Sequence, residues 1–199
     1  MTPRRARDKE QTIEDILQAA QKLFSERGLH GTSIRDIEQA SGVSKGLILY
    51  HFESKEKLYT AVQERLVQAY AAELMRSREG SRNLQEMIQA AIHASFHHTR
   101  TGREYERIAL WSYLEGQERG GGELEVQLTQ GLIETMRAGQ QAGLIRDDVD
   151  AFVMPFIIKG AIEYWMRKQD LIQELGPNVD VSIRQERLME ALAKIFLKE

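Results

Sequence analysis

The chain has 199 residues, of which 42% are hydrophobic and 29% are charged, and its formal net charge is −3. This composition is typical of a folded soluble protein and argues against a disordered chain. The absence of cysteine excludes disulfide bonds, thiolate zinc sites and cysteine nucleophiles. The longest apolar run, residues 151–158, is far shorter than the roughly 20 residues that span a bilayer. No apolar segment follows the basic N-terminus, so we expect no secretory signal and a cytoplasmic protein.

The spacing of apolar residues predicts helices along almost the whole chain. Apolar side chains recur at steps of three and four residues from Ile13 to Phe24, and Gly28 is placed to end this first helix. Three serines precede the next apolar runs as helix N-caps, and Asp36 completes a capping box with the first of them. The capped helices are expected after Ser33 at about 34–40, after Ser44 at about 45–52, and after Ser54 at about 55–77.

Beyond Gly80 the periodicity predicts longer helices, and no run of alternating apolar residues predicts a strand. We therefore predict an all-α protein of about nine helices, with an N-terminal three-helix bundle followed by a larger helical bundle. The expected domains are residues 1–58 and 59–199. The longer helices are expected at about 84–100, 105–115, 124–142, 150–175 and 183–198, with a flexible glycine segment at 120–122.

Residues 41–43 join two short helices in the manner of a helix-turn-helix. Gly42 permits the unusual backbone angle of the turn, and Val43 can anchor the turn in the core. In the second helix, Ile48 and Phe52 lie four residues apart and are expected to face the core. The remaining faces of this helix are polar, aromatic and cationic, which is typical of a helix that enters the major groove of DNA.

These residues carry a resemblance that covers about residues 10–60 in an ordered, nearly gapless way. The matching segments are Ile16 to Ala20, Leu23-Phe24, Gly28, Thr32 to Ile37, Ala40 to Gly46 and Tyr50 to Leu58. The sequence here resembles the tetracycline-repressor (TetR) family of bacterial transcription regulators. It departs from the family at Glu38, where a small residue is usual, and at Leu49, where tyrosine is frequent. We expect Glu38 to bend out to solvent or to find a cationic partner.

The resemblance implies a repressor that binds a palindromic operator in double-stranded DNA and is released by a small-molecule effector. At the start of the first short helix, a hydroxyl and a guanidinium can hold phosphate. In the second helix, Leu47 can contact a thymine methyl group. Taken singly, the charged residues fit a solvated surface equally well. The candidate DNA contacts are Ser33, Arg35, Ser44, Lys45, Gly46, Leu47, Tyr50, His51 and Lys55.

Charge is distributed unevenly along the chain. Residues 1–58 carry a net charge of +1, residues 59–199 carry −4, and the first nine residues alone carry +3. This distribution is consistent with a flexible basic arm that touches phosphate or the minor groove. A disordered, solvated tail fits the same charge equally well.

A single helix-turn-helix contacts few base pairs, so we expect a homodimer on a two-fold site. The resemblance places the interface on the last two helices, where Gly160 and Ala161 would allow close helix approach. An intramolecular core is the alternative. The candidate interface residues are Val153, Phe156, Ile157, Gly160, Ala161, Tyr164, Leu188, Leu192, Ile195 and Phe196.

Aromatic and methionine side chains on the middle helices suggest a pocket for an apolar or aromatic effector, although residues of this kind are more often core. The candidate ligand contacts are Met87, Phe96, Trp111, Tyr113, Phe152 and Trp165.

His93 and His97 have a spacing compatible with metal binding, and His98 is adjacent. No carboxylate completes a metal motif with them, so we expect partly exposed histidines, no metal and no cofactor. The sequence also has no phosphate-binding loop, nucleophile elbow or paired carboxylate, so we do not expect an enzyme. Two other classes stay open. One is an enzyme or carrier on a helical bundle, and the other is a non-specific architectural DNA binder, which the net charge disfavours.

Overall fold

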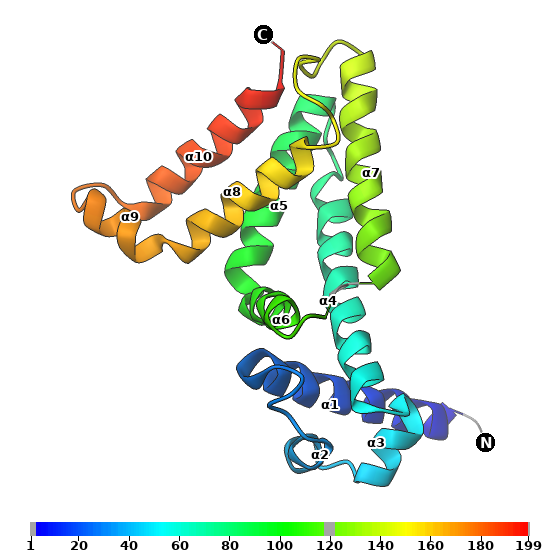
Figure 1. Cartoon of the computed structure of the whole chain (residues 1–199). Helices are drawn as coiled ribbons and strands as arrows, with labels where there is room; N and C mark the ends of the chain where they lie inside the picture. Colours follow the sequence, from blue (N-terminus) through cyan, green and yellow to red (C-terminus); the bar gives the residue numbers. More distant parts are fainter. Residues whose placement is uncertain (1–2, 118–121, 199) are drawn as a thin grey trace. The chain divides into compact units, whose positions relative to one another are not determined.

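The computed structural model describes residues 3–117 and 122–198, and the regular elements of these ranges are helices (Figure 1). The all-α class is confirmed, with ten helices rather than about nine in the described chain. None of these helices has the length and apolarity of a membrane span. The helices are α1 (Pro3–Arg27), α2 (Ile34–Ser41), α3 (Lys45–Phe52), α4 (Lys55–Ser77), α5 (Leu84–Thr101), α6 (Arg103–Leu114), α7 (Gly122–Gln141), α8 (Met154–Arg167), α9 (Gln169–Leu175) and α10 (Val181–Phe196).

The expectation of one continuous helix over residues 150–175 is wrong, because the structure divides this segment into α8 and α9. The backbone N–H of Lys168 donates to the carbonyls of Tyr164 at 3.1 Å and Trp165 at 3.2 Å, which tightens and ends α8. Pro155 stands in the first turn of α8, where a helix requires no backbone N–H donor.

The described residues form two compact units. The first comprises Met1–Gln68 and Gly102–Glu125, and the second comprises Ala69–Thr101 and Val126–Glu199. α4 and α7 each have residues in both units. Gly122 begins α7, whereas residues 120 and 121 of the expected glycine segment lie outside the described residues.

The core of the first unit joins α1 to α4 with α6. The rings of Phe24 and Tyr59 meet edge to face, with their centroids 4.8 Å apart. The Tyr59 hydroxyl lies 3.1 Å from Ser112 Oγ of α6, and burial raises the pKa of Tyr59. The core residues are Ile16, Ala20, Leu23, Phe24, Leu29, Ile37, Ile48, Leu58, Tyr59, Val62, Leu66 and Ile108.

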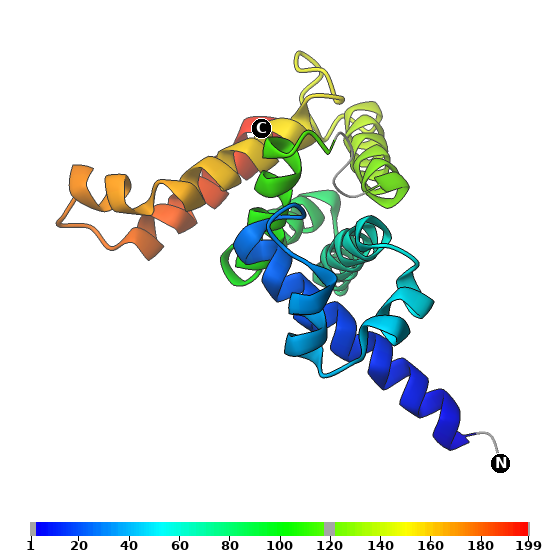
Figure 2. The ribbon, with the colours of Figure 1, turned by 60° about the horizontal axis from the view of Figure 1, so that its bottom comes forward.

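The expected flexible arm is not what the structure describes, because the backbone is helical from Pro3 onward. Figure 2 shows the N-terminal end of α1 continuing past α2 and α3. Residues 4–12 contain neither glycine nor proline, so no helix-breaking residue prevents α1 from beginning before Ile13.

The second unit is held mainly by apolar packing of α5, α8 and α10. Gly139 of α7 is packed so closely that an added methyl group would meet Ile145 and Leu84. Gln140 Nε2 donates to the carbonyls of Arg146 at 2.8 Å and Val149 at 2.7 Å, which orders the segment before α8. The core residues are Ile88, Ile92, Phe96, Met136, Ile145, Ala151, Met154, Ile162, Met189, Leu192, Ala193 and Phe196.

Candidate nucleic-acid interface

The turn between α2 and α3 has the geometry that the sequence predicts. Gly42 adopts a left-handed conformation with φ of 71°, and its N–H donates to the Glu38 carbonyl at 3.0 Å, which ends α2. Ser44 caps α3 by accepting the N–H of Leu47 at 3.4 Å. Val43 packs against the core of the first unit, so the turn is fixed from inside.

α3 presents a short outward face. Ile48 is fully buried and Phe52 packs against the same core, which confirms the expected inner side of this helix. Tyr50 is 76% exposed and Leu47 is 39% exposed. A Cβ built on Gly46 would meet no atom of the chain within 4 Å, so another molecule can approach this backbone closely. The exposed residues of α3 and its cap are Ser44, Lys45, Gly46, Leu47 and Tyr50.

The remaining candidate DNA contacts are near α3 in the sequence but differ in their exposure and in the contacts that they make. Ser33 forms a complete capping box with Asp36, whose pKa is lowered by the hydrogen bonds from the Ser33 hydroxyl and amide. Arg35 is exposed in the first turn of α2, as a phosphate contact requires. His51 is half-buried, and its ring lies 5.2 Å from that of Tyr50.

Lys55 has an internal role that the sequence did not indicate. Its ammonium group donates to the carbonyls of Leu29 at 2.7 Å and Thr32 at 2.8 Å. These carbonyls belong to the segment between α1 and α2. Lys55 therefore orders the entry to α2, and its expected contact with DNA stays a prediction.

Glu38 has a partner other than the cationic side chain that we expected as one alternative. Glu38 Oε1 accepts the backbone N–H of Lys45 at 2.8 Å. The partner is thus a main-chain amide at the start of α3, which no pattern of side chains in the sequence reveals.

Arg107 of α6 and Glu115 at its C-cap fix the end of α1, a role that the sequence did not indicate. Arg107 Nε donates to the Ser25 carbonyl at 2.6 Å, and the Glu115 carboxylate accepts the N–H groups of Leu29 and His30, each at 3.0 Å. The two residues are eight apart, about two helical turns. Their partners in the chain could not be deduced from that spacing alone.

The candidate ligand contacts are divided between the two units. Trp111 and Tyr113 belong to α6 in the first unit, where the Trp111 indole donates to the Ser25 carbonyl at 3.3 Å and Tyr113 is 83% exposed. The other four belong to the second unit. There Phe96 is buried, Met87 and Trp165 are half-buried, and Phe152 is exposed.

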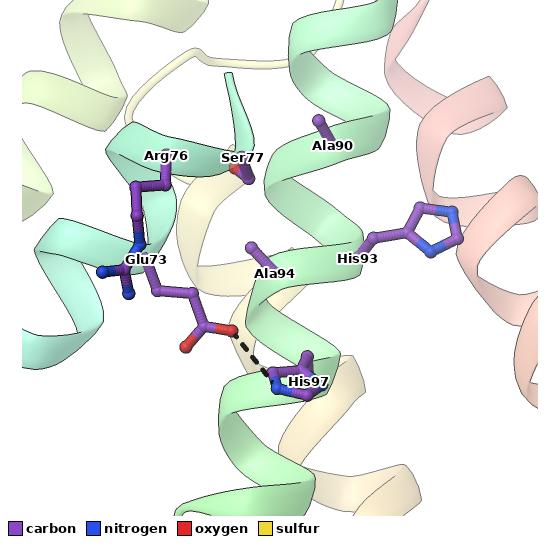
Figure 3. Close-up of a pocket in the computed structure, with 7 residues that line it drawn as sticks. All are labelled: Glu73, Arg76, Ser77, Ala90, His93, Ala94 and His97. Carbon is purple, nitrogen blue, oxygen red and sulfur yellow. Dashed lines mark ion pairs between the residues drawn. The ribbon is translucent and has the colours of Figure 1, made fainter. Parts of the chain in front are cut away.

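Two of the three histidines of α5, His97 and His98, lie beside the carboxylate of Glu73. An open groove of about 650 Å³ is lined by residues of α4 and α5. Figure 3 shows Glu73 directed toward His97 and His93 directed away from it. Glu73 Oε1 lies 3.8 Å from His97 Nε2, and Oε2 lies 3.3 Å from His98 Nδ1. His98 is buried rather than partly exposed, and this burial lowers its pKa against the opposing effect of Glu73. The described residues contain no group of three or more side chains placed to hold a metal.

The candidate dimer residues divide into exposed and buried sets. Leu192 and Phe196 lie in the core of the second unit, so their side chains are not available to a partner. This corrects the expected stripe on α10, where the apolar spacing reflects intramolecular packing. Leu188 and Ala161 pack against the same core and are half-buried. The exposed members are Val153, Phe156, Ile157, Gly160, Tyr164 and Ile195.

Two capped helices, a left-handed glycine turn and an exposed second helix define a helix-turn-helix unit. Residues 16–62 match the family model described as bacterial regulatory proteins of the tetR family. The HTH-type transcriptional repressor Rv1474c of Mycobacterium tuberculosis is 30% identical over 142 residues, which cover 70% of this chain and 72% of the repressor. The chain belongs to the TetR family.

Two further proteins are similar to this chain, one in sequence and one in structure. The HTH-type transcriptional regulator RutR of Escherichia coli (strain K12) is 41% identical over 78 residues, which cover 39% of this chain and 37% of RutR. The match thus spans little more than a third of that relative. The solved structure of SCO4942 from Streptomyces coelicolor has a TM-score of 0.75 at 23% identity, covering 93% of this chain and 98% of SCO4942, and extends the likeness of fold to both units.

Proposed function

We propose that this chain is a homodimeric transcriptional repressor that binds a palindromic DNA operator through α3 and is released by a small-molecule effector. The observation that carries the proposal is the outward face of α3, where Lys45, Leu47 and Tyr50 are exposed while Ile48 is buried. An exposed face with cationic, apolar and aromatic side chains on a short capped helix suits the major groove.

The proposed dimer surface is the exposed side of α8. Phe156 is 52% exposed, and its ring lies 5.5 Å from that of Phe152. Ile157 and Tyr164 of α8 and Val153 at its N-cap add further exposed apolar area. Exposed apolar side chains of this kind are typical of a protein interface.

The proposed effector is apolar or aromatic and binds in the second unit. Within the described residues, the buried indole Nε1 of Trp165 has no hydrogen-bond acceptor, so an effector that carries an acceptor would satisfy it. An effector that differs in affinity between the DNA-competent and DNA-incompetent states by about 1–3 kcal/mol is sufficient for control.

Selection of bound genomic fragments by the full-length protein tests the proposal. We expect enrichment of a small set of fragments that share an inverted repeat. The same selection with Lys45→Ala and Tyr50→Ala is expected to lose that enrichment. Equal recovery of all fragments by the unaltered protein would refute a specific repressor and indicate an architectural DNA binder.

A further inference from the structure

Glu38 accepts hydrogen bonds from both sides of the α2–α3 turn. Its main-chain carbonyl accepts the N–H of Gly42 at 3.0 Å, and its carboxylate accepts the N–H of Lys45 at 2.8 Å. The first bond ends α2 and the second begins α3. A single half-buried residue therefore joins the two helices across the turn.

The carboxylate is well suited to the start of α3. This helix has no acidic residue in its own first turn, and Ser44 accepts the N–H of Leu47 rather than that of Lys45. A negative charge near a helix N-terminus is favourable, and a hydrogen bond to a charged acceptor is stronger than one to a neutral acceptor. Glu38 thus supplies from α2 an interaction that α3 does not provide for itself.

The negative charge of the same carboxylate lowers the affinity for DNA of any sequence. The amide that it occupies belongs to Lys45, beside Ser44 and Gly46, where a helix N-terminus would otherwise attract phosphate. Residues 33–55 carry three basic and three acidic side chains, so this segment has no excess of positive charge to offset the repulsion. A benefit of Glu38 to DNA binding must therefore come from the geometry of α3 rather than from charge.

We propose that Glu38 is a positioning residue that fixes the orientation of α3 relative to α2 and thereby raises operator selectivity at the expense of overall DNA affinity. The proposal rests on the proposed function, in which α3 contacts base edges. Base contacts require a defined orientation of Leu47 and Tyr50, whereas phosphate contacts carry no sequence information. The carboxylate thus favours specific binding over non-specific binding.

Three substitutions separate the hydrogen bond from the charge. Glu38→Gln keeps an acceptor of the same length without the charge, Glu38→Asp keeps the charge on a shorter side chain, and Glu38→Ala removes both. Glu26→Gln is the charge-matched control, because Glu26 is exposed in the last turn of α1. The measured quantity is the ratio of the dissociation constants for a scrambled duplex and for a fragment obtained by genomic selection.

We expect this ratio to fall about tenfold in Glu38→Ala and Glu38→Asp, which corresponds to the loss of one well-oriented base contact. Glu38→Gln is expected to keep the ratio within about threefold of the original protein while binding both duplexes more tightly. An unchanged ratio in both Glu38→Ala and Glu38→Asp would overturn the proposal. An equal fall in Glu38→Gln and Glu38→Ala would also overturn it, because the hydrogen bond would then have no separate effect.

A measurement without DNA distinguishes this proposal from the proposed function. Hydrogen exchange at the Lys45 amide of the full chain is expected to accelerate about tenfold in Glu38→Ala and Glu38→Asp but not in Glu38→Gln, as for the loss of one hydrogen bond. Equal exchange in all variants refutes the positioning role whether or not the protein binds DNA. If exchange changes as expected but the unaltered protein shows no selective DNA binding, the proposed function fails and the selectivity claim fails with it.

Discussion

The two units of the protein are stabilised in the same way but differ in what they expose. In the first unit, Glu115, Lys55 and Glu38 hydrogen-bond to the main chain where the chain changes direction, and in the second unit Gln140 does so before α8. Each unit also has an apolar core. The exposed residues of α3 include a lysine beside apolar and aromatic side chains, whereas α8 exposes mainly apolar ones. A mixed surface suits contact with DNA, and an apolar surface suits contact with another protein.

Truncation of a core aromatic in the second unit is expected to have the largest effect. Phe196 is 1% exposed, and Phe196→Ala is expected to lower the free energy of unfolding by about 3–5 kcal/mol because it leaves a cavity. Urea denaturation measures this change. Phe156→Ala is the matched control on the exposed face and is expected to change the unfolding of the monomer by less than about 0.5 kcal/mol while weakening dimerisation. Comparable destabilisation of the monomer by both variants would contradict the division between core and interface.

Gly28 tests how tightly α6 is fitted to the end of α1. It has φ of 71°, and a Cβ there would meet the Glu115 carboxylate and the Trp111 ring. Gly28→Ala is expected to destabilise the first unit by about 2–3 kcal/mol, from backbone strain and loss of the Glu115 hydrogen bonds. Gly143 has the same φ and no neighbour within 4 Å, so Gly143→Ala is expected to cost only about 1 kcal/mol. Hydrogen exchange resolved by residue measures each unit separately, and equal losses would contradict the close fit at Gly28.

Lys55 tests the importance of hydrogen bonds between side chain and main chain. Lys55→Ala is expected to destabilise the first unit by about 1.5–3 kcal/mol because two carbonyls lose a charged donor. Lys57 forms an exposed ion pair with Glu53, so Lys57→Ala is expected to change stability by less than about 1 kcal/mol. Chemical denaturation compares the two variants. If Lys55→Ala left stability unchanged but weakened DNA binding, Lys55 would be a DNA contact rather than a structural residue.

Asp36 is expected to have the smallest effect, visible at low pH. Its pKa is lowered in the folded protein by the Ser33 hydroxyl and amide, so its contribution is present above the unfolded pKa and is lost as pH falls through the folded pKa. Asp36→Asn is therefore expected to flatten the dependence of stability on pH below about pH 4. Denaturation at a series of pH values measures the slope. Glu26→Gln, which lies outside the capping box, is the control, and identical profiles for Asp36→Asn and the original protein would contradict the capping interaction.

Local signals predicted the first unit well. Ser33 with Asp36, Ser44 and Gly42 defined the ends of helices because capping and left-handed turns depend on near neighbours in sequence. The contacts of Lys55 and Glu115 were not predictable, because their shared partner Leu29 lies 26 residues from Lys55 and 86 residues from Glu115. The distinction depends on sequence distance rather than on the strength of the interaction.

Apolar periodicity predicted the helices of the second unit but not their environment. Ile195 and Phe196 are adjacent in sequence, yet Ile195 is exposed and Phe196 is buried. A stripe of apolar residues has the same period whether it faces a core or a partner. The candidate ligand contacts belong to both units, because no local feature of Trp111 or Trp165 in the sequence distinguishes a pocket residue from a core residue.

The proposed function depends on recognition of DNA by the exposed face of α3. The most direct test is the dissociation constant of Tyr50→Ala for a selected operator fragment, measured by fluorescence anisotropy at fixed salt. Because the Tyr50 side chain points into solvent, its removal is expected to leave stability unchanged while raising the dissociation constant about tenfold or more. An operator affinity equal to that of the original protein would contradict the claim.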